Sequence, residues 1–155
     1  MLSLFVRNLI FTILQPGVAV VLVPYLIIRG TADTIDGRSA WQYSGVVLMA
    51  VGAAVLLLCI IRFATEGRGT ISPLDPTRRL VIRGLYRYTR NPMYLGAIVA
   101  LVGETIFWWS TAMAIYTAIV FAAFHLFILL HEEPRLERDF GAEYDDYRST
   151  VRRWI

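Results

Sequence analysis

Four long apolar stretches constrain this chain more than any other feature of its sequence. They are residues 9–28, 43–63, 93–109 and 112–130. At a rise of about 1.5 Å per residue, a helix of roughly 20 apolar residues crosses the hydrocarbon core of a bilayer. Hydrophobic residues make up 57% of the chain, which is more than one soluble domain of 155 residues needs to fill its core. The sequence therefore predicts an all-α integral membrane protein with about four transmembrane helices.

The third and fourth stretches are separated only by Ser110 and Thr111. We expect these two helices to form a tight hairpin, with Trp108 and Trp109 at the far membrane interface, where tryptophan is enriched. The first stretch is longer than the apolar core of a signal peptide, which favours a membrane helix over a cleaved leader. Small residues on the second stretch, such as Gly52, are expected to pack within the monomer, although they leave the oligomeric state open.

The distribution of positive charge predicts the orientation in the membrane. All 15 basic residues are arginine. Thirteen of them lie before the first stretch, from Arg62 at the end of the second stretch to Arg90 before the third, or after the fourth. By the positive-inside rule, both termini and the middle loop face the cytoplasm, and we expect a multi-pass protein of a bacterial inner membrane. A net charge of +3 gives no indication of a nucleic-acid partner, whereas the arginines favour contact with anionic membrane lipids.

The cysteine and histidine content argues against a metal site. Cys59 is the single cysteine and lies within the second apolar stretch, while His125 and His131 are six residues apart and do not share a helix face. Neither histidine has a neighbouring cysteine or histidine that would complete a zinc ligand set. We therefore expect neither a metal ion nor a disulfide.

A cluster of arginine and tyrosine residues lies at the start of the third stretch. The pair Asn91-Pro92 suits the N-cap and first position of a helix, but capping does not explain the side chains around it. These are Tyr86, Arg87, Tyr88, Arg90 and Tyr94. Helix N-terminal amides and arginines bind carboxylates or phosphates, and tyrosines add hydrogen bonds and stacking. The cluster therefore predicts a binding site at the membrane face.

Two adjacent carboxylates, Glu132 and Glu133, lie at the predicted end of the fourth helix, just before Pro134. Negative charge at a helix C-terminus opposes the helix dipole, so capping does not account for them. They could hold an ammonium group or ribose hydroxyls, or pair with the nearby arginines. Ionisable groups close to a bilayer are usually retained for function, which makes this pair a candidate site.

Beyond Pro134, apolar residues recur at intervals of three or four and predict one amphipathic helix on the bilayer or against the bundle. They are Leu136, Phe140, Tyr144, Tyr147, Val151 and Trp154.

Glu104, inside the third stretch, is expected to make a structural contact within the bundle rather than to relay protons.

The motif RGLYRYTRNPMYLG at residues 83–96, followed by HEEP at 131–134 and the C-terminal aromatic pattern, resembles the isoprenylcysteine carboxyl methyltransferase family. That family is related to the membrane phospholipid methyltransferases. Asn91 stands where many members have histidine, and Arg152 where proline is frequent. The resemblance covers about the C-terminal half of the chain, from near Leu74 to the end. We expect one membrane domain over residues 1–155, with an N-terminal two-helix part, 1–63, that carries no recognisable signature, and a cofactor-binding methyltransferase part, 64–155.

The resemblance further implies an S-adenosylmethionine-dependent methyltransferase with its cofactor in a cytoplasm-facing pocket. Our candidate cofactor-binding residues are Tyr86, Arg90, Asn91, Tyr94, Gly96, His131, Glu132 and Glu133. Our candidate catalytic residues are Arg87, Arg148 and Glu133. Either arginine could orient an anionic acceptor. An amine acceptor would need to lose a proton, which a glutamate such as Glu133, or His131, could accept.

The acceptor and two other functions remain open. A lipidic or hydrophobic carboxylate, amine or thiol is compatible with lateral entry from the bilayer to a cytoplasmic pocket. An NADPH-dependent membrane reductase on a related scaffold, or a small non-catalytic membrane component, would keep the same helices. Binding of the cofactor separates these alternatives from a methyltransferase.

Overall fold

The computed structural model describes residues 13–30, 38–65, 80 and 82–155, and every regular element within these ranges is a helix. In chain order the elements are η1 (Ile13–Leu22), α2 (Val23–Arg29), η2 (Ala40–Tyr43), α3 (Ser44–Thr65), η3 (Gly84–Arg87), α4 (Pro92–Trp108), α5 (Thr111–Phe127), η4 (Ile128–Glu132), α6 (Glu133–Phe140) and α7 (Ala142–Thr150). The η1 and η4 segments are π-helical, and η2 and η3 are 3-10 turns. The all-α prediction is confirmed for the described part of the chain.

Two helical stretches in the described ranges are long and apolar enough to cross a membrane, Ala40–Arg62 and Thr111–Phe140. Two shorter apolar helices, Gly17–Arg29 and Pro92–Trp108, accompany them. The structure thus contains helices that correspond to all four apolar stretches of the sequence, while a count of four full spans stays a prediction.

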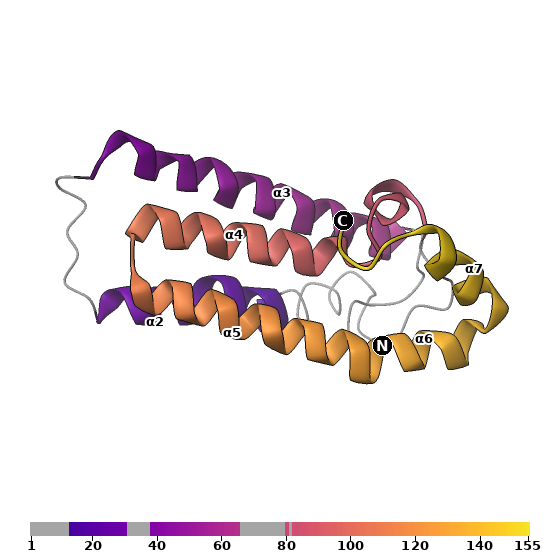
Figure 1. The fold of residues 1–155 in the computed structure, drawn as a ribbon. Helices are drawn as coiled ribbons and strands as arrows, with labels where there is room; N and C mark the ends of the chain where they lie inside the picture. Colours follow the sequence, from indigo (N-terminus) through magenta and orange to yellow (C-terminus); the bar gives the residue numbers. More distant parts are fainter. Residues whose placement is uncertain (1–12, 31–37, 66–79, 81) are drawn as a thin grey trace, which may run out of the picture.

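Helix α3 lies directly against α4, as Figure 1 shows, because glycines remove side chains from the contact. A Cβ atom at Gly52 would lie 2.5 Å from the carbonyl oxygen of Gly96, and one at Gly103 would lie 2.5 Å from that of Gly45. Small residues allow helix backbones to approach this closely where lipid leaves van der Waals packing as the main attraction. The two glycines of this stretch, Gly45 and Gly52, therefore pack within the chain, whereas Ala54 is exposed.

Helices α4 and α5 are joined by Trp109 and Ser110 alone and run side by side in Figure 1. Trp109 adopts a left-handed backbone conformation, with φ of 48°, and the Ser110 hydroxyl accepts the N–H of Met113 at the start of α5. Between the two helices, the fully buried Leu101 of α4 belongs to the same core cluster as Met113. The left-handed residue followed by an N-cap explains how the chain reverses within two residues.

The first apolar segment completes this core. Val20 of η1 is buried in the same cluster as Ala97 and Ala100 of α4, and the Tyr116 hydroxyl of α5 donates to the carbonyl oxygen of Ala19 at 2.8 Å. A carbonyl oxygen has two lone pairs, so the Ala19 carbonyl can accept this side-chain hydrogen bond in addition to a backbone one.

The fourth helix does not end at the glutamate pair, which corrects our expectation. It continues through η4 into α6, so that Thr111–Phe140 is one helical stretch. Pro134 is accommodated in the first turn of α6, where its missing N–H costs little, and the N–H of Glu133 reaches back five residues to the carbonyl of Ile128. The carboxylates therefore lie inside a continuous helical stretch, more than a turn from either end, where the helix dipole neither opposes nor favours them.

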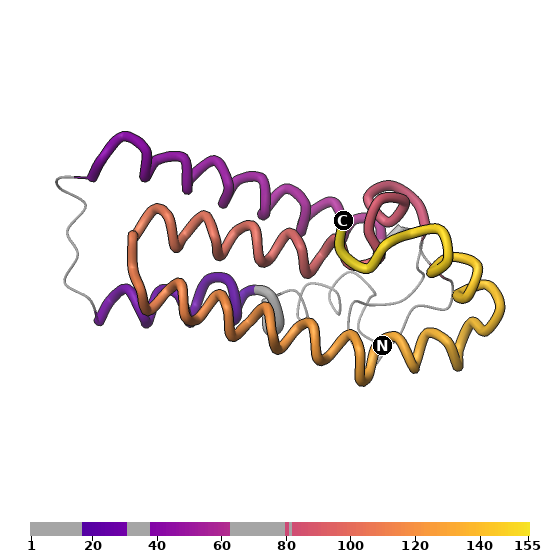
Figure 2. Tube along the Cα trace, viewed as in Figure 1, coloured from indigo at the N-terminus to yellow at the C-terminus, as the bar shows by residue number. Residues whose placement is uncertain are grey.

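The predicted single amphipathic helix after Pro134 is also wrong. Gly141, with φ of 51°, separates α6 from α7, and Figures 1 and 2 show α7 turned back toward α4 instead of continuing along the direction of α6. Tyr144 and Tyr147 are buried as a result. A residue with a side chain strongly disfavours this backbone conformation, so glycine permits the reversal.

We predict that Gly52→Val will lower the stability of the detergent-solubilised protein by about 2 kcal/mol or more, because the added side chain must separate α3 from α4. Thermal unfolding followed by circular dichroism measures the effect. The matched control is Ala54→Val on the exposed face of α3, which should change stability by less than about 0.5 kcal/mol. Equal stability of the two variants would contradict the close glycine contact.

Candidate functional site

The C-terminal residues cross the start of α4 and are held there by backbone and side-chain hydrogen bonds (Figure 2). The N–H of Arg90 donates to the carbonyl of Arg152 at 2.9 Å. The carbonyl of Arg153 accepts from the Thr89 hydroxyl at 3.1 Å and from the Asn91 side-chain amide at 3.0 Å. Asn91 thus uses its side chain to fix the C-terminal segment and makes no side-chain cap, whereas Pro92 does occupy the start of the helix as expected.

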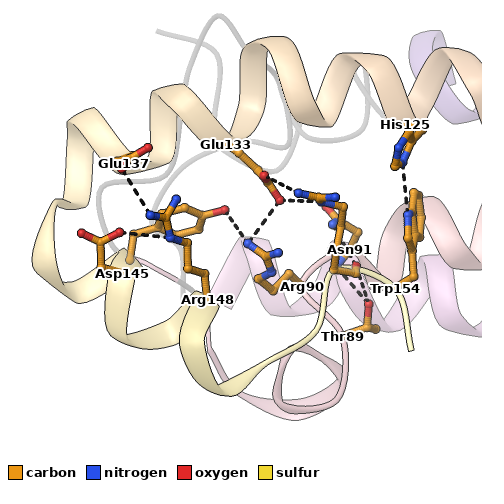
Figure 3. A network of polar contacts seen from close by, with 11 residues as sticks. Thr89, Arg90, Asn91, His125, Glu133, Glu137, Asp145, Arg148 and Trp154 are labelled. Carbon is orange, nitrogen blue, oxygen red and sulfur yellow. Dashed lines mark hydrogen bonds and ion pairs between the residues drawn. The ribbon is translucent and has the colours of Figure 1, made fainter.

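Glu133 joins this segment to α6 and to the arginine cluster (Figure 3). Arg153 donates from Nε to Oε1 at 2.8 Å and from Nη2 to Oε2 at 2.9 Å, a bidentate ion pair. Arg90 adds a contact of 3.2 Å from Nη1 to Oε1 and donates from the same nitrogen to the Tyr144 hydroxyl at 3.0 Å. Both oxygens of Glu133 are therefore engaged, and the Glu133 side chain is only 15% exposed.

Glu132 has a different environment, although it is the adjacent residue. The Tyr94 hydroxyl of α4 donates to Glu132 Oε2 at 2.7 Å, and the Tyr94 ring contacts Phe124 of α5 with ring centres 4.9 Å apart. A tyrosine hydroxyl leaves the charge of a carboxylate largely uncompensated, in contrast to two guanidinium groups. Glu132 is thus a positioned carboxylate, and the positive charge of Arg135 also acts on it and favours its ionised form.

The two glutamates lie beyond the apolar part of their helix, which ends at Leu130, and their pKa values shift in opposite directions. Burial raises the pKa of Glu132 above its ordinary value, and the hydrogen bond from Tyr94 only partly offsets this. Burial alone would also raise the pKa of Glu133, but the hydrogen bond from Arg153 and the charge of Arg90 hold it below its ordinary value. Neighbouring carboxylates with separated pKa values can take separate chemical roles.

Tyr86 connects this cluster to α3. Its carbonyl accepts from the Tyr147 hydroxyl at 2.7 Å, its side chain hydrogen-bonds with Cys59, and it is 7% exposed. Burial, followed by proximity to Cys59, raises the pKa of Tyr86 well above its ordinary value, so the phenol stays protonated at neutral pH. The negative charge of Glu132 acts in the same direction.

The structure brings some of the predicted site residues together and leaves others apart. Arg90, Asn91, Tyr94 and the glutamate pair form a connected group, with Tyr86 beside it. The others lie elsewhere. Gly96 packs against Val55 of α3. His131 is exposed and stacks on Phe127, and Arg87 is exposed on η3. Arg148 pairs with Glu137 and Asp145 on the surface.

Sequence reasoning missed Arg153, which supplies the strongest partner of Glu133. The C-terminal aromatic pattern drew attention to the surrounding residues but gave no indication that the chain reverses at Gly141, which brings Arg153 to α6. Trp154, placed on the predicted amphipathic face, instead donates its indole N–H to His125 Nδ1 at 3.3 Å. His125 is therefore a contact for the C-terminal segment.

The cluster offers groups that fit S-adenosylmethionine. Glu132 could accept from an ammonium group or ribose hydroxyls, and Arg90 could face a carboxylate, since its buried Nε has no hydrogen-bond partner among the described residues. Tyr86 and Tyr94 could provide aromatic surface. No group of three or more potential metal ligands occurs within the described ranges. A cavity of about 430 Å³, lined by α3 and η3, reaches the cluster at Tyr86. A second cavity, of about 770 Å³, lies among apolar residues of η1, α2, α3 and α4 and is lined by none of the residues of the cluster.

Comparison with known proteins points to one family. The profile described as phospholipid methyltransferase matches residues 40–143, which include Arg90, Tyr94 and both glutamates. No solved structure matches the chain.

Curated relatives are similar at low identity. A probable protein-S-isoprenylcysteine O-methyltransferase of Oryza sativa subsp. indica is 26% identical over 114 residues, covering 71% of this chain and 58% of the relative. Protein-S-isoprenylcysteine O-methyltransferase A of Arabidopsis thaliana is 28% identical over 120 residues, 74% of this chain and 59% of the relative. The chloroplastic 15-cis-zeta-carotene isomerase of Arabidopsis thaliana is 25% identical over 144 residues, 89% of this chain and 38% of the relative. The chain thus spans less than two thirds of these proteins.

We predict that Glu133→Gln will destabilise the neutral-pH protein by about 1–3 kcal/mol, because the ion pair with Arg153 is lost. The folded pKa of Glu133 is lowered, so its contribution is fully present above the unfolded value of about 4.3 and is lost as pH falls through the folded value. Thermal unfolding of both proteins from pH 7 to pH 3 should show the difference shrinking in acid. A difference that stays constant with pH would contradict an ionised pair.

Proposed function

Because the chain belongs to the phospholipid methyltransferase family, we propose that it transfers a methyl group from S-adenosylmethionine to a lipidic or hydrophobic acceptor at the cytoplasmic face of a membrane. The observation that carries the proposal is the cluster of Glu132, Tyr94 and Arg90, which lies within the matched residues and combines a carboxylate, a phenol and a guanidinium. The isoprenylcysteine methyltransferases among its relatives favour the same reaction class.

S-Adenosylmethionine supplies a methyl group on a sulfonium that is already activated, so this chain needs no nucleophile of its own. Its residues act by positioning. Glu132 would hold the amino group or ribose hydroxyls, Tyr94 fixes the orientation of Glu132, and Arg90 would face the carboxylate. Asn91 acts indirectly, because its side-chain amide holds the C-terminal segment. Glu133, with both oxygens engaged by Arg153, holds the C-terminal segment in place, so its contacts favour a positioning role over the catalytic role expected from sequence.

The acceptor class sets a further requirement. A carboxylate acceptor attacks in its ionised form, whereas an amine acceptor must first lose a proton. Glu132 suits that task better than Glu133, because its pKa is raised toward the working pH while that of Glu133 is lowered. His131, exposed one residue before Glu132, is the second candidate base. Arg148 is engaged with Glu137 and Asp145, and we assign it no catalytic step.

We also propose four membrane spans with both termini in the cytoplasm. Helices α4 and α5, with the two-residue connection between them, would form a membrane hairpin. The end of the hairpin that carries Trp108 and Trp109 would lie at the outer interface. Arg38 supports this placement, because its guanidinium lies over the rings of Phe107 and Trp108 and donates to the Phe107 carbonyl at the end of α4.

The cofactor prediction is tested by calorimetry on the purified protein in detergent. Wild type should bind S-adenosylmethionine and S-adenosylhomocysteine but not NADPH, and Glu132→Ala/Glu133→Ala should bind neither adenosyl compound. The double variant could also disturb the C-terminal segment, so Glu132→Gln is the sharper variant. It should weaken binding of S-adenosylmethionine at least about tenfold, because the loss of one charge-assisted hydrogen bond has about this effect on affinity.

The control for this measurement is Glu143→Gln, which removes an exposed carboxylate of α7 and should leave affinity unchanged. Binding of NADPH, or no binding of S-adenosylmethionine by well-folded wild type, would contradict the methyltransferase proposal and favour a reductase or a non-catalytic component. Where the cofactor binds, methylation of a lipidic acceptor should exceed that of its tail-free analogue. Equal rates would contradict lateral entry from the bilayer.

The topology is tested by cysteine labelling in right-side-out vesicles on a Cys59→Ala background. Ser39→Cys, before α3, should react with a membrane-impermeant maleimide without permeabilisation, whereas Glu143→Cys should react only after permeabilisation. Both positions are exposed, so access to the thiol is not limited by packing. Labelling of both from the same side would contradict the proposed arrangement.

A further inference from the structure

The larger cavity, of about 770 Å³, lies between the η1–α2 segment and α3 and is also lined by Ala100 and Glu104 of α4. Among the described residues that line it, Tyr25 and Glu104 have the only polar side chains. Ligand sites in proteins commonly have a volume of roughly 300–1,000 Å³ and an apolar lining with a few placed polar groups. This cavity, which we call the Glu104 cavity, has both properties.

Glu104 has a carboxyl oxygen without a partner. The sequence predicts a structural contact for this residue, but Oε2 is buried and has no hydrogen-bond partner in the part of the chain that the structure describes. Tyr116 of α5 is close enough to feel the charge of Glu104, yet its hydroxyl donates to the Ala19 carbonyl. A buried carboxyl without a hydrogen bond is costly, and a donor supplied by a ligand removes that cost. Rotation of the carboxyl group exchanges its two oxygens, so one donor in the cavity can serve either.

The position of Glu104 separates this cavity from the candidate site for methyl transfer. Glu104 follows Tyr94 by ten residues on α4, which is about 15 Å at the standard helical rise. Tyr94 contacts Glu132, whereas Glu104 lies one turn before Trp108 at the other end of α4. None of the residues that line the cavity belongs to the glutamate cluster. A polar group held by Glu104 is therefore out of reach of a methyl donor bound at Glu132.

The cavity is elongated along α3 and has exposed apolar walls. Its α3 lining extends from Met49 to Ile60, a length of about 16 Å, and Met49 packs beside Gly103, the neighbour of Glu104. Val21 of η1 and Leu57 of α3 are 65% and 57% exposed. Exposed apolar side chains around a hollow are typical of grooves that bind apolar ligands. A linear hydrocarbon chain that extends from Glu104 along α3 fits this shape.

We propose that the Glu104 cavity binds a long-chain membrane molecule whose hydroxyl or amino group donates a hydrogen bond to the Glu104 carboxyl. Its chain lies along α3 between Met49 and Ile60. Because a carboxylate only accepts hydrogen bonds, it favours a donor over a phosphate or a second carboxylate. This ligand is distinct from the methyl acceptor, and the inference does not depend on the proposed function.

The test measures binding of dodecylamine, dodecanol and dodecyl methyl ether to the full chain in detergent by calorimetry. The three compounds share one alkyl chain, but the ether has no donor. The amine or the alcohol should bind wild type at least about tenfold more tightly than the ether, the effect of one hydrogen bond to a charged group. Glu104→Leu should remove this preference. Equal binding of all three compounds to wild type, or a preference that persists in Glu104→Leu, would overturn the proposal.

Glu104→Gln identifies the donor, because its amide oxygen still accepts a hydrogen bond but carries no charge. A preference for dodecylamine that Glu104→Gln loses indicates an ion pair with an amine. A preference for dodecanol that Glu104→Gln keeps indicates a neutral hydrogen bond with an alcohol.

Ala53→Phe tests the location without changing Glu104. Ala53 lines the cavity, so the added ring should fill part of it and weaken binding of the preferred compound at least about tenfold. The matched control is Ala54→Phe, an exposed position outside the lining, which should keep wild-type affinity. Equal affinity of the two variants would contradict binding in this cavity.

Binding of S-adenosylmethionine is measured in parallel on wild type and Glu104→Leu. It should be the same in both, because Glu104 lies at the other end of α4 from Glu132. A loss in Glu104→Leu would contradict the separation of the two sites. No binding by wild type would count against the methyltransferase proposal alone, so the failures of the two proposals are distinguishable.

Discussion

The ion pair between Glu133 and Arg153 holds together the end of this fold that carries the candidate site. It connects the start of α6 to a segment 20 residues later in the chain, and Arg90 extends it to the residue just before α4. The hydrogen bonds of Thr89 and Asn91 to the Arg153 carbonyl fix the same segment from the other side. Ion pairs of this kind are favourable only when their remaining hydrogen-bonding groups are also satisfied, and both oxygens of Glu133 are.

This arrangement gives two adjacent glutamates different properties. Glu133 is engaged on both oxygens by Arg153 and contributes to structure, whereas Glu132 accepts a hydrogen bond from the Tyr94 phenol and lies within the influence of the Arg135 charge. The sequence motif presents them as a pair with similar roles. The difference depends on which face of the helix each side chain occupies and on a C-terminal arginine that the motif does not include.

Local patterns in the sequence predicted the helices well, and long-range contacts explain where prediction failed. The apolar stretches correspond closely to α3, α4 and α5, because composition and length determine a membrane helix almost without tertiary information. Two errors came from single residues. Pro134 was taken as a helix end, but a π-helical turn accommodates it, and Gly141 was passed over within an amphipathic pattern that it in fact divides. Arg153 could not be assigned to Glu133 without knowledge of that reversal.

The continuity of Thr111–Phe140 couples the candidate site to the thickness of the surrounding membrane. Its apolar part is about 30 Å long at the standard rise, and Glu132 and Glu133 follow on the same helical stretch. A helix responds to a thinner bilayer by tilting, and the carboxylates then move sideways together with the end of the helix. Tyr94 belongs to the neighbouring helix α4, and Arg90 lies two residues before it, so the distances from them to the glutamates depend on the angle between the two helices. Lipid chain length is thereby a variable that can adjust the geometry of this site.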